Sequence, residues 1–230
     1  MYGLMPELFP SPEFEVRRLR AAKLISYLKK TYSEPKTELT YTTPFELLVA
    51  VILSAQCTDK KVNLVTPRLF AQYPTVQAFA AAEPGELAEA LSSITYFQSK
   101  TKYLIGSAKV LIEQFEGRVP RTEKELVQLP GVAYKTAHVV LGELYGVHEG
   151  IATDTHVRRF ALRFDLTDNT ELTKISKDLE ALIPKKDWKY VNNGFVLYGR
   201  YVCPATRHEC LEHPLTLLWP KAALSWPRAK

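Results

Sequence analysis

Lys135 and Asp154 have the residue types that a covalent attack on a sugar carbon requires. Lys135 closely follows the run Leu129-Pro130-Gly131-Val132, and Asp154 comes nineteen residues later. A neutral lysine amine can displace a leaving group at an electrophilic carbon, such as C1′ of a sugar, and form a Schiff base there. A nearby carboxylate can help to deprotonate the amine and stabilise the positive charge that develops on the sugar. A solvated lysine at a helix edge is the structural alternative, because most lysines are of that kind.

Asp154 has a second possible role. It stands immediately before Thr155-His156-Val157-Arg158-Arg159, where an aspartate is a favourable helix N-cap. The two roles are compatible, because a cap fixes the position of the carboxylate.

A pair of helices is predicted to position the lysine. Thr122 and Glu125 have the spacing of a capping box, which predicts a short helix that starts at Glu123. Pro130-Gly131 ends that helix, and a second helix is expected over 134–145, with Gly146 as its stop. The start of the second helix can present backbone N–H groups to a phosphate.

Two sequence blocks resemble the endonuclease III family of helix-hairpin-helix DNA glycosylases. Leu-Pro-Gly-Val-x-x-Lys-Thr-Ala at 129–137 is followed by x-Asp-Thr-His at 153–156, and Leu-Ser-x-Gln-x-Thr-Asp occurs at 53–59. The resemblance extends from about Tyr41 to Cys203. It implies a base-excision repair enzyme that removes oxidised pyrimidines from duplex DNA and nicks the abasic site by β-elimination. In that enzyme Lys135 would be the nucleophile and Asp154 the assisting carboxylate.

Two other functions remain open at this point. One is a monofunctional mismatch glycosylase of the same superfamily, and the other is a helix-hairpin-helix DNA-binding protein without catalysis. Enzymes of the first kind usually lack the lysine at the position of Lys135, and a non-catalytic protein has no need of Lys135 and Asp154. Retention of both residues therefore favours the bifunctional enzyme.

Further DNA contacts are implied by the resemblance. Gln56 corresponds to the residue that fills the space left by a flipped base. Tyr96 stands where the family usually has an aliphatic wedge, and its ring could stack on the orphan base. Ser54 and Arg158 are also expected to contact DNA. A helix-end amide for Gln56 and a core aromatic for Tyr96 are the structural alternatives.

The hairpin differs from the family pattern at two positions. Gly131 is retained, but Ala133 replaces a usual glycine and Tyr134 replaces a frequent arginine. The Ala133 N–H can still bind a phosphate, although its methyl group would hold the phosphate further away. Weaker binding of DNA through the hairpin could be offset by other cationic side chains. For each of them the alternative is a solvated surface charge without a role in DNA binding. These cations are Arg158, Arg159, Lys60 and Lys61.

The C-terminal cysteines are too few for the family's [4Fe–4S] cluster. Cys203 and Cys210 keep the first spacing of the pattern Cys-x6-Cys-x2-Cys-x5-Cys, but the third position is His213 and the fourth is Trp219. A cluster of this type usually requires four thiolates, so no cluster, no other metal and no cofactor are expected. A Cys2His2 zinc site that adds His208 is one alternative. The other is a metal-free segment packed by its apolar side chains: Leu211, Leu215, Leu217, Leu218, Trp219, Leu224 and Trp226.

The hydrophobic pattern predicts an all-α protein with two helical domains. The resemblance implies a six-helix barrel over 37–148, with the helix-hairpin-helix at about 123–146. The remainder, 1–36 and 149–230, would form the second domain, with the active cleft between the two. Residues 1–12 are expected to be an irregular arm, and 14–32 an amphipathic helix with Val16 and Leu19 inward and Arg20 outward.

Charge and composition agree with an intracellular nucleic-acid partner. The net charge is +5, and three cysteines give no disulfide framework. No apolar run approaches the roughly 18 residues of a membrane span, and the first residues lack a targeting pattern. We therefore expect a cytoplasmic, nucleoid-associated monomer that binds double-stranded DNA containing damaged bases or abasic sites, without membrane contact.

Overall fold

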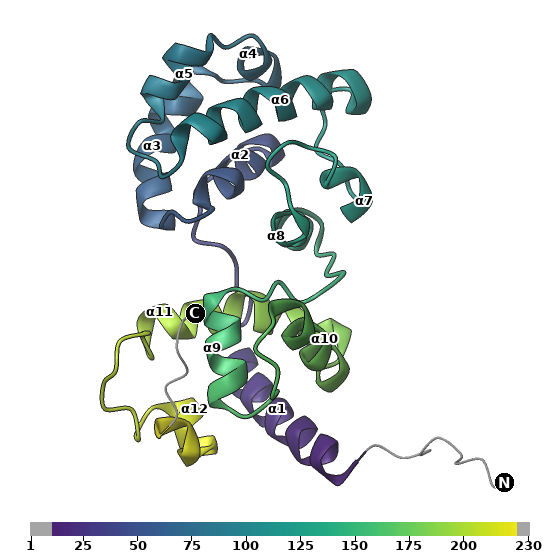
Figure 1. The fold of residues 1–230 in the computed structure, drawn as a ribbon, viewed down its shortest axis with the longest axis vertical. Helices are drawn as coiled ribbons and strands as arrows, with labels where there is room; N and C mark the ends of the chain where they lie inside the picture. Colours follow the sequence, from purple (N-terminus) through teal and green to yellow (C-terminus); the bar gives the residue numbers. More distant parts are fainter. Residues whose placement is uncertain (1–10, 225–230) are drawn as a thin grey trace, which may run out of the picture. The chain divides into compact units, whose positions relative to one another are not determined.

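The computed structural model describes residues 11–224, and every regular element among them is a helix (Figure 1). The predicted all-α class is therefore confirmed. Most of the arm predicted over 1–12 and Trp226 of the predicted apolar tail lie outside the described residues. No helix within 11–224 is both long enough and apolar enough to cross a membrane.

The chain divides into two compact units. Lys36–Glu149 form one, here called the central unit. Met1–Pro35 and Gly150–Lys230 form the other, here called the terminal unit. The boundaries of the central unit lie one residue outside the predicted 37–148.

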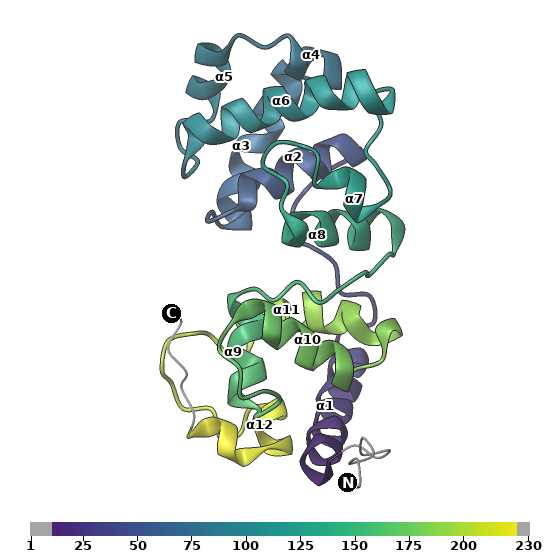
Figure 2. The same ribbon diagram turned by 45° about the vertical axis from the view of Figure 1, so that its right-hand side comes forward.

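The central unit is built around a buried helix. All seven side chains from Leu47 to Leu53 are buried, because this segment has no polar residue to place toward solvent. The helix that carries them packs against three others, labelled α3, α6 and α8 (Figure 2). The helices of the unit are α2 (Pro44–Ser54), α3 (Asp59–Gln72), α4 (Val76–Ala80), α5 (Pro84–Ala90), α6 (Phe97–Phe115), α7 (Glu123–Leu126) and α8 (Tyr134–Tyr145).

The terminal unit has its own apolar core, formed by both ends of the chain. Leu24 and Leu28 of the N-terminal helix pack with Phe160, Phe195 and Tyr198 from later helices. Its elements are α1 (Pro12–Thr31), α9 (Thr155–Arg163), α10 (Leu172–Leu182), η1 (Lys185–Asp187), η2 (Tyr190–Gly194), α11 (Phe195–Tyr201), α12 (Pro214–Leu218) and η3 (Pro220–Ala223).

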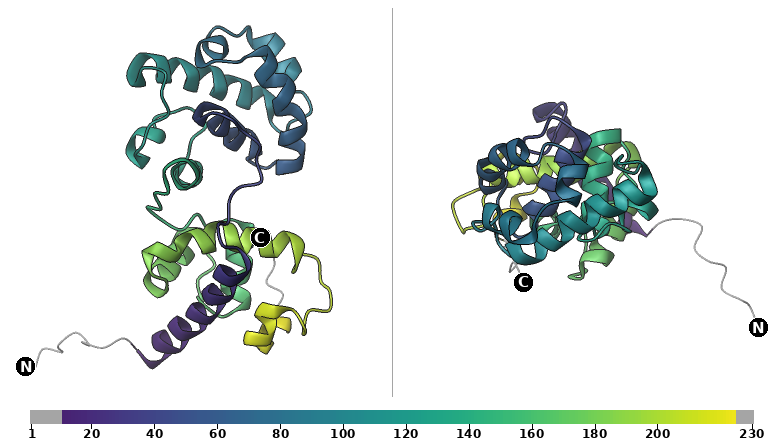
Figure 3. Two further views of the ribbon diagram at one scale, coloured as in Figure 1. Left: turned by 180° about the vertical axis from the view of Figure 1, so that it is seen from behind. Right: turned by 90° about the horizontal axis from the view of Figure 1, so that it is seen from above.

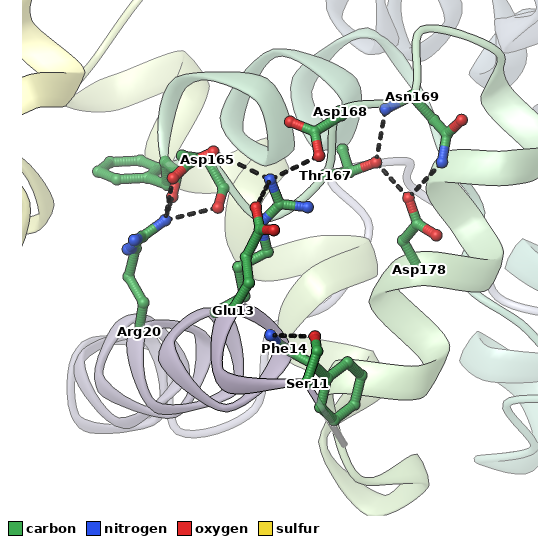
Figure 4. Close-up of polar contacts among 11 residues, drawn as sticks. Ser11, Glu13, Phe14, Arg20, Asp165, Thr167, Asp168, Asn169 and Asp178 are labelled. Atoms are coloured by element: carbon green, nitrogen blue, oxygen red, sulfur yellow. Dashed lines mark hydrogen bonds and ion pairs between the residues drawn. The ribbon is translucent and has the colours of Figure 1, made fainter. Parts of the chain in front are cut away.

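The predicted inward and outward faces of α1 are wrong at its first turns. Arg20 is only 8% exposed, whereas Val16 and Leu19 are more than half exposed. Arg20 donates to the Phe164 carbonyl and to the carboxylate of Asp165, whose φ is +50° (Figure 4). The buried arginine thus ties α1 to the end of α9 and holds a left-handed residue there.

A second polar group fixes the connection from α9 to α10. Thr167 and the Asn169 side-chain amide both donate to the Asp178 carboxylate of α10 (Figure 4). The backbone N–H of Asn169 donates to the Thr167 hydroxyl at 3.0 Å. Side chains of the turn after α9 therefore bind it to the carboxylate of Asp178 on α10.

The predicted apolar packing of the C-terminal segment is largely wrong. Leu215 is buried and Trp219 is half-buried, but the other leucines of the described segment point to solvent. Those exposed residues are Leu211, Leu217, Leu218 and Leu224. The segment packs on the core of the terminal unit through Leu215, Trp219 and Ala222 rather than through most of its leucines.

Candidate active site

The hairpin forms where its sequence signals predict it. The Thr122 hydroxyl accepts the Glu125 N–H and donates to the Glu125 carboxylate, so α7 begins at Glu123. Glu123 in turn contacts the His138 ring, which joins α7 to α8. The two helices lie side by side in the central unit (Figure 2). The predicted bounds of the second helix are confirmed at Tyr134 and Tyr145.

Gly131 forms the turn of the hairpin against α6. Its φ is +80°, and a Cβ there would lie 2.7 Å from Cγ of Tyr103. The Ser107 hydroxyl donates to the Pro130 carbonyl at 2.7 Å. Helix α6 therefore supports the turn both by close packing and by a hydrogen bond, and only glycine fits the turn without strain.

The start of α8 is open. Ala133 is the N-cap and supplies no side-chain acceptor for the first N–H groups of the helix. These groups remain able to bind an anion, as the sequence predicts. Lys135 lies in this first turn with an exposed side chain. Ala133, Tyr134 and Lys135 thus form one accessible surface, while the phosphate contact itself stays a prediction.

The start of α9 is closed by Asp154. Oδ1 of this half-buried carboxylate accepts the Val157 N–H at 2.8 Å. The predicted N-cap is confirmed, and the catalytic role stays a prediction. The cap fixes the orientation of this carboxylate on α9.

Gln56 and Tyr96 share an uncommon backbone conformation. Their φ values are +53° and +56°, in the left-handed region that bulky residues rarely occupy. Both side chains are exposed, and Tyr96 is 63% exposed, so it is not a core aromatic. Backbone strain of this kind persists where the surroundings enforce it, and it is concentrated at functional sites. The predicted roles at a flipped base agree with this geometry but are not tested by it.

Lys100 connects these two positions. It is 4% exposed, and its Nζ donates to the carbonyls of Leu53 and Ala55 at 2.7 Å each. Its backbone N–H donates to the Tyr96 carbonyl. Burial lowers the pKa of the Lys100 ammonium. One lysine thus closes the end of α2 just before Gln56 and also belongs to the first turn after Tyr96.

The remaining residues predicted to contact DNA differ in their exposure, and their contacts with DNA stay predictions. Ser54 is half-buried and donates its hydroxyl to the Val51 carbonyl, while Arg158 is half-buried on α9. Lys60 and Lys61 are exposed in the first turn of α3. Arg159 is buried and donates to the Cys203 carbonyl at 2.6 Å, so its proposed compensation for the hairpin is wrong.

The C-terminal residues do not fit the four-thiolate set of a [4Fe–4S] cluster. Cys203 and Cys210 are buried, but the fourth position of the pattern, Trp219, lies under the Arg20 guanidinium at 3.5 Å. An indole in this contact supplies no ligand, and three cysteines in the whole chain cannot provide four thiolates.

Comparisons with known proteins agree with this geometry. Residues 49–185 match the model of the HhH-GPD superfamily of base excision DNA repair proteins. Endonuclease III of Synechocystis is 43% identical over 209 residues, which cover 91% of this chain and 95% of that protein. Endonuclease III of Bacillus subtilis is 40% identical over 188 residues, which cover 81% and 85%. The chain belongs to the endonuclease III family.

Solved structures of the family extend the match to the fold. A structure of a trapped covalent intermediate of endonuclease III with DNA has a TM-score of 0.82 at 36% identity and covers 89% of this chain and 96% of its own. A thermostable thymine-DNA glycosylase matches at a TM-score of 0.74 and 19% identity, which shows the fold alone. The resemblance inferred from the two sequence blocks is confirmed.

Two buried cations, Lys100 and Arg163, were not predicted from the sequence. Lys100 lies four residues before Leu104 on the buried stripe of α6, and a lysine on an apolar stripe was a usable signal. Arg163 is 1% exposed and bonds to two cysteines of the C-terminal segment, 40 and 47 residues away. No local pattern indicates that contact.

Proposed function

We propose that this member of the endonuclease III family excises oxidised pyrimidines from duplex DNA, with Lys135 as nucleophile and Asp154 as assisting carboxylate. The observation that carries the proposal is the position of Lys135, exposed in the first turn of a helix whose N–H groups are open to a phosphate. A related structure is described as a trapped covalent intermediate with DNA, which is the kind of complex an attacking lysine produces.

The reaction divides into two steps. Nζ of neutral Lys135 bonds to C1′ as the bond from C1′ to the base breaks, and the base leaves with the electron pair and gains a proton. The sugar ring opens as the aminated C1′ becomes a Schiff base with Lys135. Loss of a C2′ proton then expels the 3′ phosphate, and water releases the sugar remnant from the lysine. The strand is nicked on the 3′ side of the lesion.

Asp154 would act while the base departs. Its charge stabilises the oxocarbenium-like sugar and favours removal of a proton from the attacking amine. The Val157 N–H holds one oxygen, so the carboxylate is oriented before substrate binds. Such orientation avoids reorganisation during the reaction.

The central unit would bind the substrate strand. The open N–H groups at Ala133 and beyond fit a phosphate, and Gln56 and Tyr96 fit the space left by a flipped base. The protein would act as a monomer, because the proposed site needs no second copy of the chain. We place the protein in the cytoplasm, associated with the nucleoid, where this substrate is found.

Borohydride trapping tests the proposal. Wild-type protein and duplex DNA with an abasic site should give a stable covalent complex, because borohydride reduces the Schiff base. Lys135→Gln should abolish it. Lys124→Gln is the matched control, since Lys124 is an exposed lysine of α7 in the same hairpin. This control should trap at the wild-type level.

Undiminished trapping by Lys135→Gln would move the nucleophile to another amine. Base release by wild-type protein without any trapping would instead favour the monofunctional mismatch glycosylase. Binding without base release or trapping would favour the non-catalytic DNA-binding protein.

A further inference from the structure

Three potential metal ligands meet where the C-terminal segment turns. The sulfurs of Cys203 and Cys210 and a ring nitrogen of His208 all lie within 4.8 Å of one another. Both cysteines are buried, and both lie within the connection from α11 to α12, which runs out as a long loop (Figures 1 and 3). The loop between Cys203 and Cys210 therefore brings the two cysteines close together.

The spacing of the three atoms suits a single ion. Zinc binds sulfur at about 2.3 Å and imidazole nitrogen at about 2.0–2.1 Å, so tetrahedral ligand atoms lie roughly 3.3–3.8 Å apart. If the distances between the ligand atoms shortened by about 1 Å from their upper limit of 4.8 Å, they would match those of a tetrahedral zinc site. Two thiolates and imidazoles form an established zinc ligand set. The short sequence spacings between these residues do not keep Cys203, His208 and Cys210 apart.

His213 lies beside His208 but outside the group of three ligand atoms, and its ring would have to move toward them to supply a fourth ligand. Its ring centroid lies 5.1 Å from that of His208, with 32° between the ring planes. Its Nδ1 is buried and has no hydrogen-bond partner, which is costly for a polar atom unless something binds there. His208 Nδ1 lies 2.7 Å from the Thr206 carbonyl. A proton on that nitrogen leaves Nε2 as the ligand atom, because a carbonyl that accepts from one ring nitrogen of a metal-binding histidine orients the other nitrogen toward the metal.

Arg163 prepares the two sulfurs. It donates to Cys203 Sγ at 3.0 Å and to Cys210 Sγ at 3.1 Å. The Ala222 carbonyl accepts from its Nε and Nη2 and so holds the guanidinium in place. These hydrogen bonds hold the two sulfurs close together and fix their orientation. This buried arginine therefore acts as a preformed outer shell.

From this arrangement we propose that Cys203, His208, Cys210 and His213 bind one Zn²⁺ ion. Binding displaces the protons of the two thiols, and no redox step is involved. The ion adds to the apolar packing of a segment most of whose leucines are exposed. It fixes the connection from α11 to α12 on the terminal unit and replaces the expectation of a metal-free segment.

Metal analysis of the untagged protein tests the proposal. We expect about one zinc and no iron per chain, retained through gel filtration. Cys203→Ser and Cys210→Ser should each lose the zinc. Cys57→Ser is the matched control, because Cys57 is the remaining cysteine of the chain and lies in the central unit. It should keep the full zinc content.

Two readouts do not depend on the variants folding. In wild-type protein a thiol reagent should modify one cysteine per chain, and all three after chelation. Cobalt added to the chelated protein should give the visible bands of tetrahedral thiolate coordination. No zinc in the purified protein and no cobalt bands after chelation would overturn the proposal whatever the thiol count, because burial alone can protect Cys203 and Cys210. So would about four irons per chain.

Discussion

Helices α8 and α9 begin in opposite ways. Helix α8 starts at Ala133, which provides no acceptor for the first N–H groups. Helix α9 starts at Asp154, whose carboxylate accepts the Val157 N–H. The first helix leaves its positive end available to an anion from outside, whereas the second uses its own carboxylate there.

The difference shows how one structural device can serve two purposes. An open helix start attracts a phosphate, and it must remain open to do so. A closed start fixes a carboxylate, which can then act on a substrate at little cost of reorganisation. The end of α2 is a third case. Lys100, on α6, donates hydrogen bonds to the carbonyls at this end, just before Gln56. Substitutions that open a closed end, or close the open one, test these assignments.

The largest effect is expected at Asp154. Asp154→Asn keeps an N-cap but removes the charge, so base release should slow at least about 100-fold, or about 2.7 kcal/mol. Single-turnover kinetics measure this, and binding to duplex DNA should be unchanged. Asp154→Ala should lose the cap as well, at about 1 kcal/mol of stability in thermal unfolding. Wild-type turnover in Asp154→Asn would leave the aspartate a cap alone.

Lys100→Met should have the next largest effect. It removes a buried ammonium that bonds to two carbonyls, and about 2 kcal/mol of stability should be lost. Affinity for duplex DNA with a stable abasic-site analogue should fall more than affinity for undamaged duplex, because Gln56 and Tyr96 lose their shared support. Lys102→Met is the control, since Lys102 is exposed on the same helix. Equal loss of both affinities would contradict a positioning role.

Gly131→Ala should destabilise the hairpin by about 2 kcal/mol, because a methyl group there meets Tyr103 at a φ that alanine avoids. Gly146→Ala is the matched comparison: its φ is +64°, and nothing lies within 4 Å of the added methyl. It should cost only the conformational term, about 1 kcal/mol. Chemical unfolding of both variants separates the steric contribution of Tyr103 from the conformational contribution. Equal losses of stability would mean that the Tyr103 side chain moves aside at no cost.

The sequence was sufficient for the hairpin and insufficient for the C-terminal segment. Thr122, Pro130 and Gly146 act on the chain within a few residues, so local rules fixed α7 and α8. Arg20 and Arg163 were not predictable in this way, because their partners lie 40 to 145 residues away. Hydrophobic periodicity predicts that a charged residue lies on the solvent-exposed face of a helix. It does not predict a distant carbonyl or sulfur that accepts a hydrogen bond from that residue.

The same limit applies to the proposed site. Motif spacing identified Lys135, Asp154 and Gln56, but nothing local predicted the left-handed backbone of Gln56 and Tyr96. That conformation depends on contacts such as those of Lys100, which bring two separate helices together. Residues with a proposed role toward substrate belong to recognisable sequence motifs. Residues that support them can be predicted only where, like Lys100, a charged residue interrupts the apolar face of a helix.

The smallest effects are expected at Ala133, where the open start of α8 can be altered directly. Ala133→Asp introduces an N-cap carboxylate like that of Asp154, which should stabilise the helix by about 1 kcal/mol. The same carboxylate occupies the N–H groups and repels phosphate, so affinity for duplex DNA should fall several-fold. Ala133→Gly removes the methyl group that separates a phosphate from the backbone, and affinity should rise slightly. Fluorescence anisotropy at one fixed salt concentration compares the three proteins, because backbone contacts depend strongly on salt. Opposite changes in stability and affinity for Ala133→Asp distinguish a phosphate site from an ordinary helix start, and unchanged affinity would show that DNA does not use this end of α8.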